Sequence, residues 1–428
     1  MAIMTLVLLV IFIVIMLLGI PVGFGMGALT VIAFTLLGGD LSMIPQKMFA
    51  GIDTYTYVCI LLFILSADIM SVGGITRAIV IFCEKLVGHI RGGLAHVNVL
   101  ASMLFAGLSG SAAADAAGLG PIEIKMMTDG GYDREFSSSV TAASAIIGPI
   151  IPPSNIMIIY AGCVGTVSVG KMFLAGAIPG ILLGIAYMIF CYYISLKRAY
   201  PCREKRAPLK EIAKATWQTL PALLLPIIIM GSITTGICTA TESSAIAVVY
   251  STVVAICKKQ LSFGSFYRAC VRSAKAAANV LFIIAIATAM AWAITTLGVA
   301  QALTSFCVEY VNSKIVFLIF VNILLLIIGM LLDASPALLL MVPILWPVAK
   351  TFGINDVHFG VMVCFNLMVG TLTPPVGMML FIVSNVGKVK LSVLYKTILP
   401  FCAVAIIVLA LITFIPALTT WLPGVLMP

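Results

Sequence analysis

The sequence predicts an all-α polytopic membrane protein made of two repeats, each with a re-entrant helical hairpin and a helix broken at a Pro-Pro pair. Three observations support this fold class. Of the 428 residues, 62% are hydrophobic and 9% are charged, against roughly 45–50% and about 25% in soluble domains. Apolar runs recur near the length of about 20 residues that a membrane-spanning helix needs. Glycine and proline also recur at one fixed spacing in the two halves of the chain.

This composition excludes a soluble enzyme core, a nucleic-acid-binding module and a disordered tail, so no nucleic-acid partner is expected. The mean hydropathy of +1.22 places most of the chain in a lipid bilayer. A span with its connection takes roughly 30 to 40 residues, which leaves room for about 11 to 14 membrane segments. Chains of this kind are transporters, channels or intramembrane enzymes.

The first elements are apolar helices followed by a surface arm. Residues 1–20 resemble the apolar core of a signal peptide, but no basic residue precedes Lys47, so we expect a retained first span. Pro21 and its neighbouring glycines separate this run from a second helix. A span at about 58–70 follows. The charged residues between 77 and 91, on an apolar background, predict a helix that lies in the membrane surface.

Two basic stretches predict how the middle of the chain crosses the membrane. Residues 197–214 hold seven Lys or Arg against two Glu, and residues 258–275 hold five Lys or Arg and no acid. Because basic residues gather in cytoplasmic connections, both stretches are expected on that side. Two crossings, at about 217–233 and 243–256, connect them through a polar turn at 239–242. The formal net charge of +9 is therefore interpreted as topology rather than as a sign of an anionic partner.

The two halves of the chain align at a constant offset of 222 residues. Residues 131–154 lie over residues 353–376 without a gap, and further upstream Gly74 lies near Gly298 at an offset of 224. Glycine and proline are the residues that a shared break in the backbone needs, so an internal duplication is predicted. The matched pairs are Pro121 with Pro343, Gly148 with Gly370, Pro152 with Pro374 and Pro153 with Pro375.

Each half places a Pro-Pro pair inside an apolar run, at Pro152 and Pro153 and at Pro374 and Pro375. Proline lacks a backbone donor, so carbonyls of the preceding turn are released. In hydrocarbon such carbonyls persist only where protein or a cavity covers them, and in transporters they bind cations. A proline kink used only for packing is the alternative. The residues that flank the breaks supply adaptable backbone or hydroxyls: Gly148, Ser154, Gly370 and Thr373.

Two carboxylates are expected at membrane depth, Asp115 and Asp333, each in a hairpin candidate. An aspartate near the bilayer centre costs about 2.5–3.5 kcal/mol on the insertion scale, so it usually faces a cavity or a partner. The 222-residue offset places Ser111 on Asp333. Asp115 instead falls on Ala337, so the halves have diverged as a site for an asymmetric substrate requires. Capping of the hairpin tips is the plainer alternative. Ser109 and Ser111 either supply hydroxyl ligands or are small interface residues.

Four stretches of this chain resemble motifs of the large, DctM-like membrane subunit of the TRAP transporters, the tripartite ATP-independent periplasmic family. With their spacing they extend over nearly the whole chain. Ala240 and Ser243 depart from the family pattern, which has proline and alanine there. The stretches are GLSGSAAADAAGLGPIEIKMM from Gly107, IIGPIIPPSNIMIIYA from Ile146, GICTATESSAIAVVY from Gly236 and VGTLTPPVG from Val369.

The resemblance implies an elevator-type ion transporter fold, in which scaffold helices and arms hold a mobile domain of two hairpins and two broken helices. It implies symport with Na⁺, two or more ions, and import of an organic carboxylate such as sialic acid or a C4-dicarboxylate. A soluble periplasmic binding protein would deliver the solute. A small four-helix membrane subunit, expected as a separate chain, would accompany this one in the bacterial inner membrane.

The matching motifs also assign site residues by resemblance, several of them acting through backbone carbonyls. The first sodium site would be formed by Ser109, Gly148, Ile151 and Pro153. The second would be formed by Gly329, Gly370, Thr373 and Val376. The solute would lie between the hairpins, near Ser111, Asp115, Ser154 and Asp333.

The same resemblance divides the chain into five parts. Scaffold helices and an arm occupy residues 1–94, and the first hairpin and broken helix occupy 95–170. Scaffold helices, cytoplasmic loops and a second arm occupy 171–314. The second hairpin and broken helix occupy 315–390, and a C-terminal helix occupies 391–428.

Three other functions are compatible with parts of this sequence. A stand-alone sodium-coupled dicarboxylate transporter would share the hairpins but need no binding protein. An intramembrane serine protease would use the GLSG sequence at 107–110, which matches a GxSG nucleophile motif, with His358 as the base that such a nucleophile needs. A protease explains neither the repeat nor the Pro-Pro breaks. An ion channel would need a filter motif, which the sequence lacks.

Overall fold

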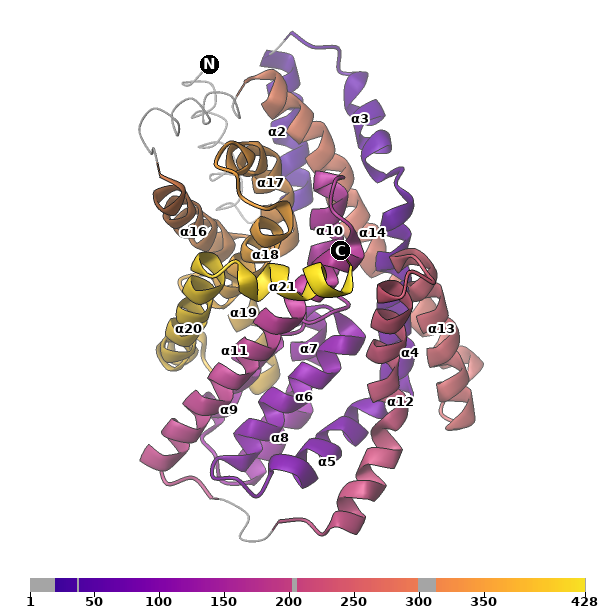
Figure 1. The fold of residues 1–428 in the computed structure, drawn as a ribbon, viewed down its shortest axis with the longest axis vertical. Helices are drawn as coiled ribbons and strands as arrows, with labels where there is room; N and C mark the ends of the chain where they lie inside the picture. Colours follow the sequence, from indigo (N-terminus) through magenta and orange to yellow (C-terminus); the bar gives the residue numbers. More distant parts are fainter. Residues whose placement is uncertain (1–19, 37, 202–205, 299–312, 428) are drawn as a thin grey trace.

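The structure of the chain is a computed structural model that describes residues 20–36, 38–201, 206–298 and 313–427. The predicted first span lies outside these ranges, as do residues 299–312 of the segment 171–314 to which the second arm is assigned. Every regular element within them is helical, as Figure 1 shows, so the predicted all-α class is confirmed.

Eight of the described helices are long and apolar enough to cross a membrane. Counting by span length gave about 11 to 14 segments. The counts differ because part of the apolar sequence forms shorter helices, among them Gly93–Ser109 and Asn155–Val164, which belong to a hairpin and to a broken helix.

One group of elements, which we call the flanking helices, packs beside the hairpins. Within it α4 packs against α13 and α14, α14 packs against α2 and α3, and α12 packs against α13 and α5. The Ser66 hydroxyl of α4 lies 2.7 Å from the Ser251 hydroxyl of α13, which fixes that pair of helices. The group comprises α2 (Val22–Leu36), α3 (Met43–Ile52), α4 (Val58–Val72), α5 (Ile75–Val87), α12 (Leu209–Thr234), α13 (Ala240–Cys257) and α14 (Phe263–Thr296).

The predicted surface arm corresponds to α5. This helix follows Gly74, whose φ of +65° is in the left-handed region that glycine adopts without strain. It packs against the first hairpin. Gly298, the matching glycine of the second half, has a φ of +69°. The two matched glycines therefore share the left-handed backbone conformation.

The second group, which we call the hairpin core, contains two hairpins and two broken helices. The first half consists of α6 (Gly93–Ser109), α7 (Ala112–Gly118), α8 (Gly120–Asp129), α9 (Arg134–Ala145) and α10 (Asn155–Val164). The second half consists of α16 (Lys314–Leu331), α17 (Ala334–Thr351), α18 (Asp356–Leu372) and α19 (Met378–Gly387). In both halves a hairpin precedes a helix that is interrupted at Pro-Pro, as the sequence predicts.

Three further helices cover the hairpin core. α11 packs against α6 and α20, and α20 packs against α9 and α18. α21 packs against α11. Their bounds are α11 (Val169–Lys197), α20 (Leu391–Phe414) and α21 (Ala417–Leu426).

The helix boundaries of the two halves follow the 222-residue offset. In Figure 1, α9 lies below α10, whereas α18 lies above α19. The two broken helices therefore run in opposite directions along the long axis, and the duplication is an inverted one. Five boundaries match without deviation: the ends of α6 and α16 at Ser109 and Leu331, the starts of α7 and α17 at Ala112 and Ala334, the ends of α8 and α17 at Asp129 and Thr351, the starts of α9 and α18 at Arg134 and Asp356, and the starts of α11 and α20 at Val169 and Leu391.

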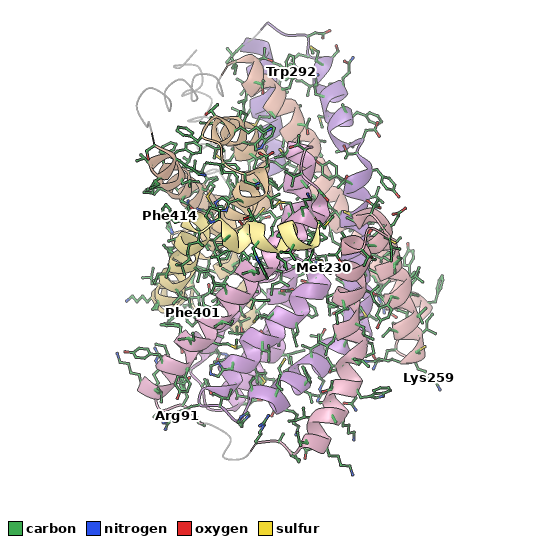
Figure 2. All side chains as sticks on the ribbon, in the orientation of Figure 1. Arg91, Met230, Lys259, Trp292, Phe401 and Phe414 are labelled. Atoms are coloured by element: carbon green, nitrogen blue, oxygen red, sulfur yellow. The ribbon has the colours of Figure 1, made fainter. Side chains whose placement is uncertain are left out.

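Both basic stretches meet at one end of the molecule, which we call the basic end. Figure 2 labels Arg91 and Lys259 in its lower part. The Lys258 ammonium donates to the Gln218 carbonyl at 3.2 Å, so the loop after α13 lies beside the first turns of α12. An ion pair of 2.5 Å from Lys85 to Glu211 connects α5 to α12 at the same end. This arrangement agrees with two crossings between the two basic stretches.

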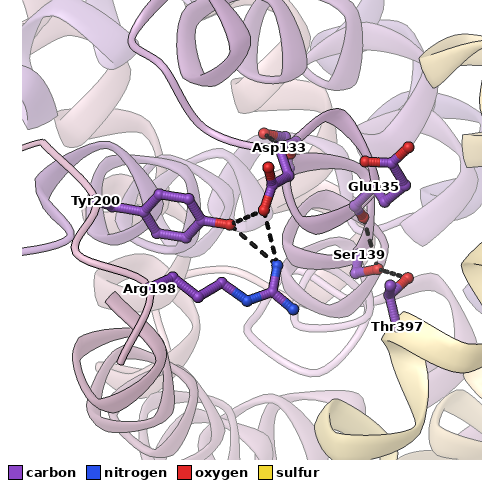
Figure 3. A network of polar contacts seen from close by, with 7 residues as sticks. Asp133, Glu135, Ser139, Arg198, Tyr200 and Thr397 are labelled. Atoms are coloured by element: carbon purple, nitrogen blue, oxygen red, sulfur yellow. Dashed lines mark hydrogen bonds and ion pairs between the residues drawn. The ribbon is translucent and has the colours of Figure 1, made fainter. Parts of the chain in front are cut away.

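A polar network at the basic end connects α9, α11 and α20 (Figure 3). Arg198 donates to Asp133 at 2.9 Å, and the Tyr200 hydroxyl donates to the same carboxylate at 2.5 Å. Burial, and then the bond to Asp133, raise the pKa of Tyr200 to about 12, so its phenol stays a donor at neutral pH. Six residues after Asp133, in α9, the Ser139 hydroxyl lies 2.6 Å from that of Thr397. These contacts hold the lower end of the first broken helix in place.

Two glycines of the hairpin core press against rings of the flanking helices. A Cβ on Gly107 of α6 would overlap the ring of Pro226 in α12. A Cβ on Gly162 of α10 would lie 2.5 Å from ring atoms of Tyr57, in the 3-10 turn before α4. At both contacts the hairpin core therefore presents bare backbone to the ring, because glycine has no side chain.

Candidate functional site

The tip of the first hairpin is shaped by three residues. α6 ends at Ser109 because Gly110 adopts a φ of +59°, which turns the chain back. Ser111 then caps α7 by accepting a hydrogen bond from the Ala114 amide at 3.4 Å. The reversal brings the start of α7 alongside the end of α6.

Asp115 is buried at this tip and faces the first helix break. Its side chain is 1% exposed, Oδ1 accepts the hydroxyl hydrogen of Ser109, and Oδ2 has no hydrogen-bond partner among the described residues. A Cβ on Gly148 would overlap Oδ2, so the glycine leaves the space that this oxygen fills. The structure therefore places Asp115 together with Ser109 and Gly148, two of the residues assigned to the first sodium site.

The first break lies between α9 and α10 and is joined to the hairpin tip. Its Pro152-Pro153 bond is cis. The Asn155 amide donates to the Gly110 carbonyl at 3.4 Å. Ser154 is buried and its hydroxyl donates to the Pro149 carbonyl within the break. Among the described residues no donor reaches three other carbonyls of this segment: those of Gly148, Ile151 and Pro153.

The second break has the same relation to the second hairpin. The Gly377 amide, which the repeat offset pairs with that of Asn155, donates to the Met330 carbonyl at 3.1 Å. Thr373 caps α18, and its hydroxyl donates back to the Val369 carbonyl at 2.8 Å. Within the described ranges, the carbonyls of Thr373 and Val376 accept no hydrogen bond.

Gly329 and Gly370 allow the second hairpin to touch the second broken helix. A Cβ on Gly370 would lie 2.6 Å from the Cα of Gly329, which is closer than side-chain carbons approach a backbone. Backbone oxygens of α16 and α18 therefore lie beside each other at this crossing. All four residues assigned to the second sodium site, Gly329, Gly370, Thr373 and Val376, come from this crossing and the break that follows it.

Both clusters have the donors that a hard cation prefers, since such ions take carbonyl, hydroxyl and carboxylate oxygens. The first adds a carboxylate with an unpartnered oxygen to its carbonyls. The second offers carbonyls and one threonine hydroxyl. The residues present thus fit two sodium ions, one with a charged ligand and one without.

A cavity of about 400 Å³ separates the hairpin tips from the flanking helices α4 and α14. Ser111 and Asp333, the N-terminal caps of α7 and α17, both line it. Asp115 and Ser154 are not among its described lining residues and lie buried behind its wall. Of the four residues assigned to the solute, the structure therefore brings Ser111 and Asp333 to one cavity.

Sequence reasoning missed an ion pair in the wall of this cavity. Arg272 of α14 donates through Nε to Asp68 of α4 at 3.0 Å. The Ser273 hydroxyl donates to the same carboxylate oxygen at 2.8 Å. The available signal was a charged residue at 68 inside the predicted span at 58–70. Arg272 had been interpreted as part of a basic loop.

The residues of the protease interpretation do not meet. Ser109 donates to Asp115. His358 lies at the start of α18, where Nδ1 is 2.9 Å from the Thr419 hydroxyl of α21. His358 is therefore not placed to take the proton of Ser109, as the protease interpretation requires.

Comparisons with known proteins agree with this architecture. The family described as "Tripartite ATP-independent periplasmic transporter, DctM component" matches residues 9–418. The sialic acid TRAP transporter large permease protein SiaM of Vibrio cholerae is 40% identical over 95% of this chain and 95% of its own length. The C4-dicarboxylate TRAP transporter large permease protein DctM of Pseudomonas aeruginosa is 37% identical over 93% of this chain and 92% of its own. The crystal structure of the YdaH transporter of Alcanivorax borkumensis has a TM-score of 0.65, with 13% identity, over 86% of this chain and 87% of that chain, which indicates a shared fold.

Proposed function

The chain belongs to the family of the DctM component of tripartite ATP-independent periplasmic transporters, and from this premise we propose that it imports an organic carboxylate by sodium symport. It is a transporter permease of the bacterial inner membrane and not an enzyme. The observation that carries the proposal is the pair of oxygen clusters formed where each hairpin tip meets a helix break. They flank the cavity that would hold the solute.

Sodium coupling has a physical basis in this arrangement. In the proposal, Ser109, Asp115 and the free carbonyls of the first break hold one ion, and Thr373 with the second break holds another. Two sodium ions with one monoanion carry one net positive charge inward. That movement is favoured by about 2.3 kcal/mol per 100 mV of inside-negative potential. A bare anion would be opposed by the same potential.

The charges of the cavity favour a monocarboxylate that carries hydroxyl groups. Among its described lining residues Arg272 is the one cation, and its ion pair with Asp68 offsets part of its charge, so the cavity offers a cationic partner to no more than one carboxylate. Asp333 is exposed to the cavity and would repel a second carboxylate, whereas it accepts hydrogen bonds from hydroxyls. A sugar acid such as sialic acid satisfies both conditions better than a C4-dicarboxylate does.

The partners follow from the family. A TRAP large permease works with a small membrane subunit and a soluble periplasmic binding protein, and we propose both for this chain. We also propose that the hairpin core moves against the flanking helices as an elevator. The glycine contacts at Pro226 and Tyr57 support a sliding boundary between the two groups.

Uptake into proteoliposomes tests the proposed function. The vesicles contain this chain and its small membrane subunit, and the binding protein is added outside. We expect sialic acid uptake that requires both an inward sodium gradient and the binding protein. Unlabelled succinate should compete at least about tenfold less well than unlabelled sialic acid, because one extra buried charge without a partner costs more than 1.4 kcal/mol.

Other results would point elsewhere. Sodium-driven uptake without binding protein would indicate a stand-alone transporter. Uptake that is indifferent to sodium would overturn the coupling proposal, and stronger competition by succinate would overturn the assignment of the solute class.

A further inference from the structure

Arg272 lines the solute cavity from the flanking helices rather than from the hairpin core. Its side chain is 60% exposed, and α14 carries it about nine residues from the start of that helix. α14 begins directly after the loop at 258–262, so Arg272 lies toward the basic end of the cavity. The residue therefore belongs to the part of the molecule that the proposed movement leaves in place.

The contacts of Arg272 leave its recognition surface free. Nε donates to Asp68, while Nη1 and Nη2 have no hydrogen-bond partner among the described residues. Asp68 is itself held by the Ser273 hydroxyl, so the guanidinium is fixed at one edge only. The two Nη groups form the planar donor pair that binds a carboxylate in bidentate geometry.

We propose that Arg272 is the carboxylate-binding residue on the cytoplasmic side of the cavity, oriented by Asp68, and that it sets the affinity for solute entering from the cytoplasm. The inference rests on the proposed function and deepens it. Because Arg272 is fixed while Ser111 and Asp333 belong to the hairpin core, the solute touches all three only in the arrangement described here. Solute delivered from the periplasm would meet the hairpin tips without Arg272.

The distribution of charge indicates that Arg272 lies on the cytoplasmic side of the cavity. Basic residues gather on the cytoplasmic face of membrane proteins, and the basic end holds the described parts of 197–214 and 258–275. A cation on this side of the cavity attracts an anionic solute from the cytoplasm and delays its departure. Asp68 reduces that attraction by neutralising part of the guanidinium charge.

Inhibition of uptake by internal solute measures this contact. The proteoliposomes are loaded with increasing sialic acid, and sodium-driven uptake is started by external binding protein, so only molecules with the periplasmic face outward are observed. For Arg272→Gln we expect the internal concentration that halves uptake to rise at least about tenfold, because a charge-assisted bond is lost. The external concentration of loaded binding protein that gives half-maximal uptake should change less than twofold.

Two further variants complete the test. Asp68→Asn should lower the half-inhibitory internal concentration, since it frees the guanidinium, and it keeps the test informative if Arg272→Gln does not assemble. Lys275→Gln removes a positive charge one turn away on α14 from an exposed residue outside the cavity lining and should behave like the wild type. An unchanged half-inhibitory concentration in both Arg272→Gln and Asp68→Asn would overturn the inference, as would an equal shift in Lys275→Gln. A wild-type protein without sodium-dependent uptake would instead overturn the proposed function.

Discussion

Replacing Asp115 with asparagine is expected to raise the sodium concentration for half-maximal uptake by at least about 30-fold. The carboxylate is buried, holds the Ser109 hydroxyl with one oxygen and presents the other against Gly148 at the first helix break. Removing one member of a buried charge pair costs about 2–5 kcal/mol, of which the lower bound corresponds to about 30-fold. Asparagine has nearly the same shape, so the hairpin should fold. The measurement is initial uptake against external sodium at saturating binding protein.

The matched control for this variant lies on the same hairpin. Asp129→Asn removes the same charge from an exposed residue at the end of α8 and should leave the sodium dependence unchanged. If Asp115→Asn instead weakened the dependence on solute and left the sodium dependence intact, Asp115 would belong to the solute site, as the sequence-based assignment had it.

Replacing Gly370 with alanine is expected to reduce uptake to a few per cent of the wild-type rate and to lower the melting temperature. The added Cβ would lie 2.6 Å and 2.8 Å from backbone atoms of Gly329, so a whole helix must shift. Overpacking of this kind costs typically about 1–3 kcal/mol. The shift would also separate the carbonyls that we assign to the second sodium ion. Thermal unfolding in detergent and uptake at high sodium measure the two effects.

Gly231→Ala is the control for this substitution. Gly231 lies inside α12, and a Cβ there meets no atom within 4 Å, so the alanine should stabilise the helix slightly or have no effect. Wild-type uptake and stability in Gly370→Ala would show that the close approach of α16 and α18 is not required.

The parts of the fold that repeat could be predicted from the sequence. The 222-residue offset rests on glycine and proline, whose backbone requirements are local, and the helix bounds follow it at Asp129 and Thr351 and at Arg134 and Asp356. The direction of the second half was not predicted, because hairpins hide the number of crossings. Ser111 and Asp333 were predicted to be near the solute and do line one cavity, since both cap the returning helix of a hairpin.

The contacts that the sequence did not indicate all depend on long-range packing. Asp115 lies six residues after Ser109, but its contact with Gly148 depends on how the hairpin folds against the break. Asp68 and Arg272 are separated by 204 residues and meet only when α4 packs against α14. Arg272 also stood in a basic stretch that topology already explained.

The two glycine contacts between the hairpin core and the flanking helices bear on the rate of the movement proposed above. Interdigitated side chains slow the sliding of two helices, because each side chain must leave the gap that it fills before the helices can move. At two contacts the hairpin core contributes a glycine and no side chain: Gly107 against Pro226 and Gly162 against Tyr57. If the hairpin core moves as we propose, this boundary would resist the movement little, and the rate would be set at the two end states, where the hairpin tips and the proposed ions change their contacts.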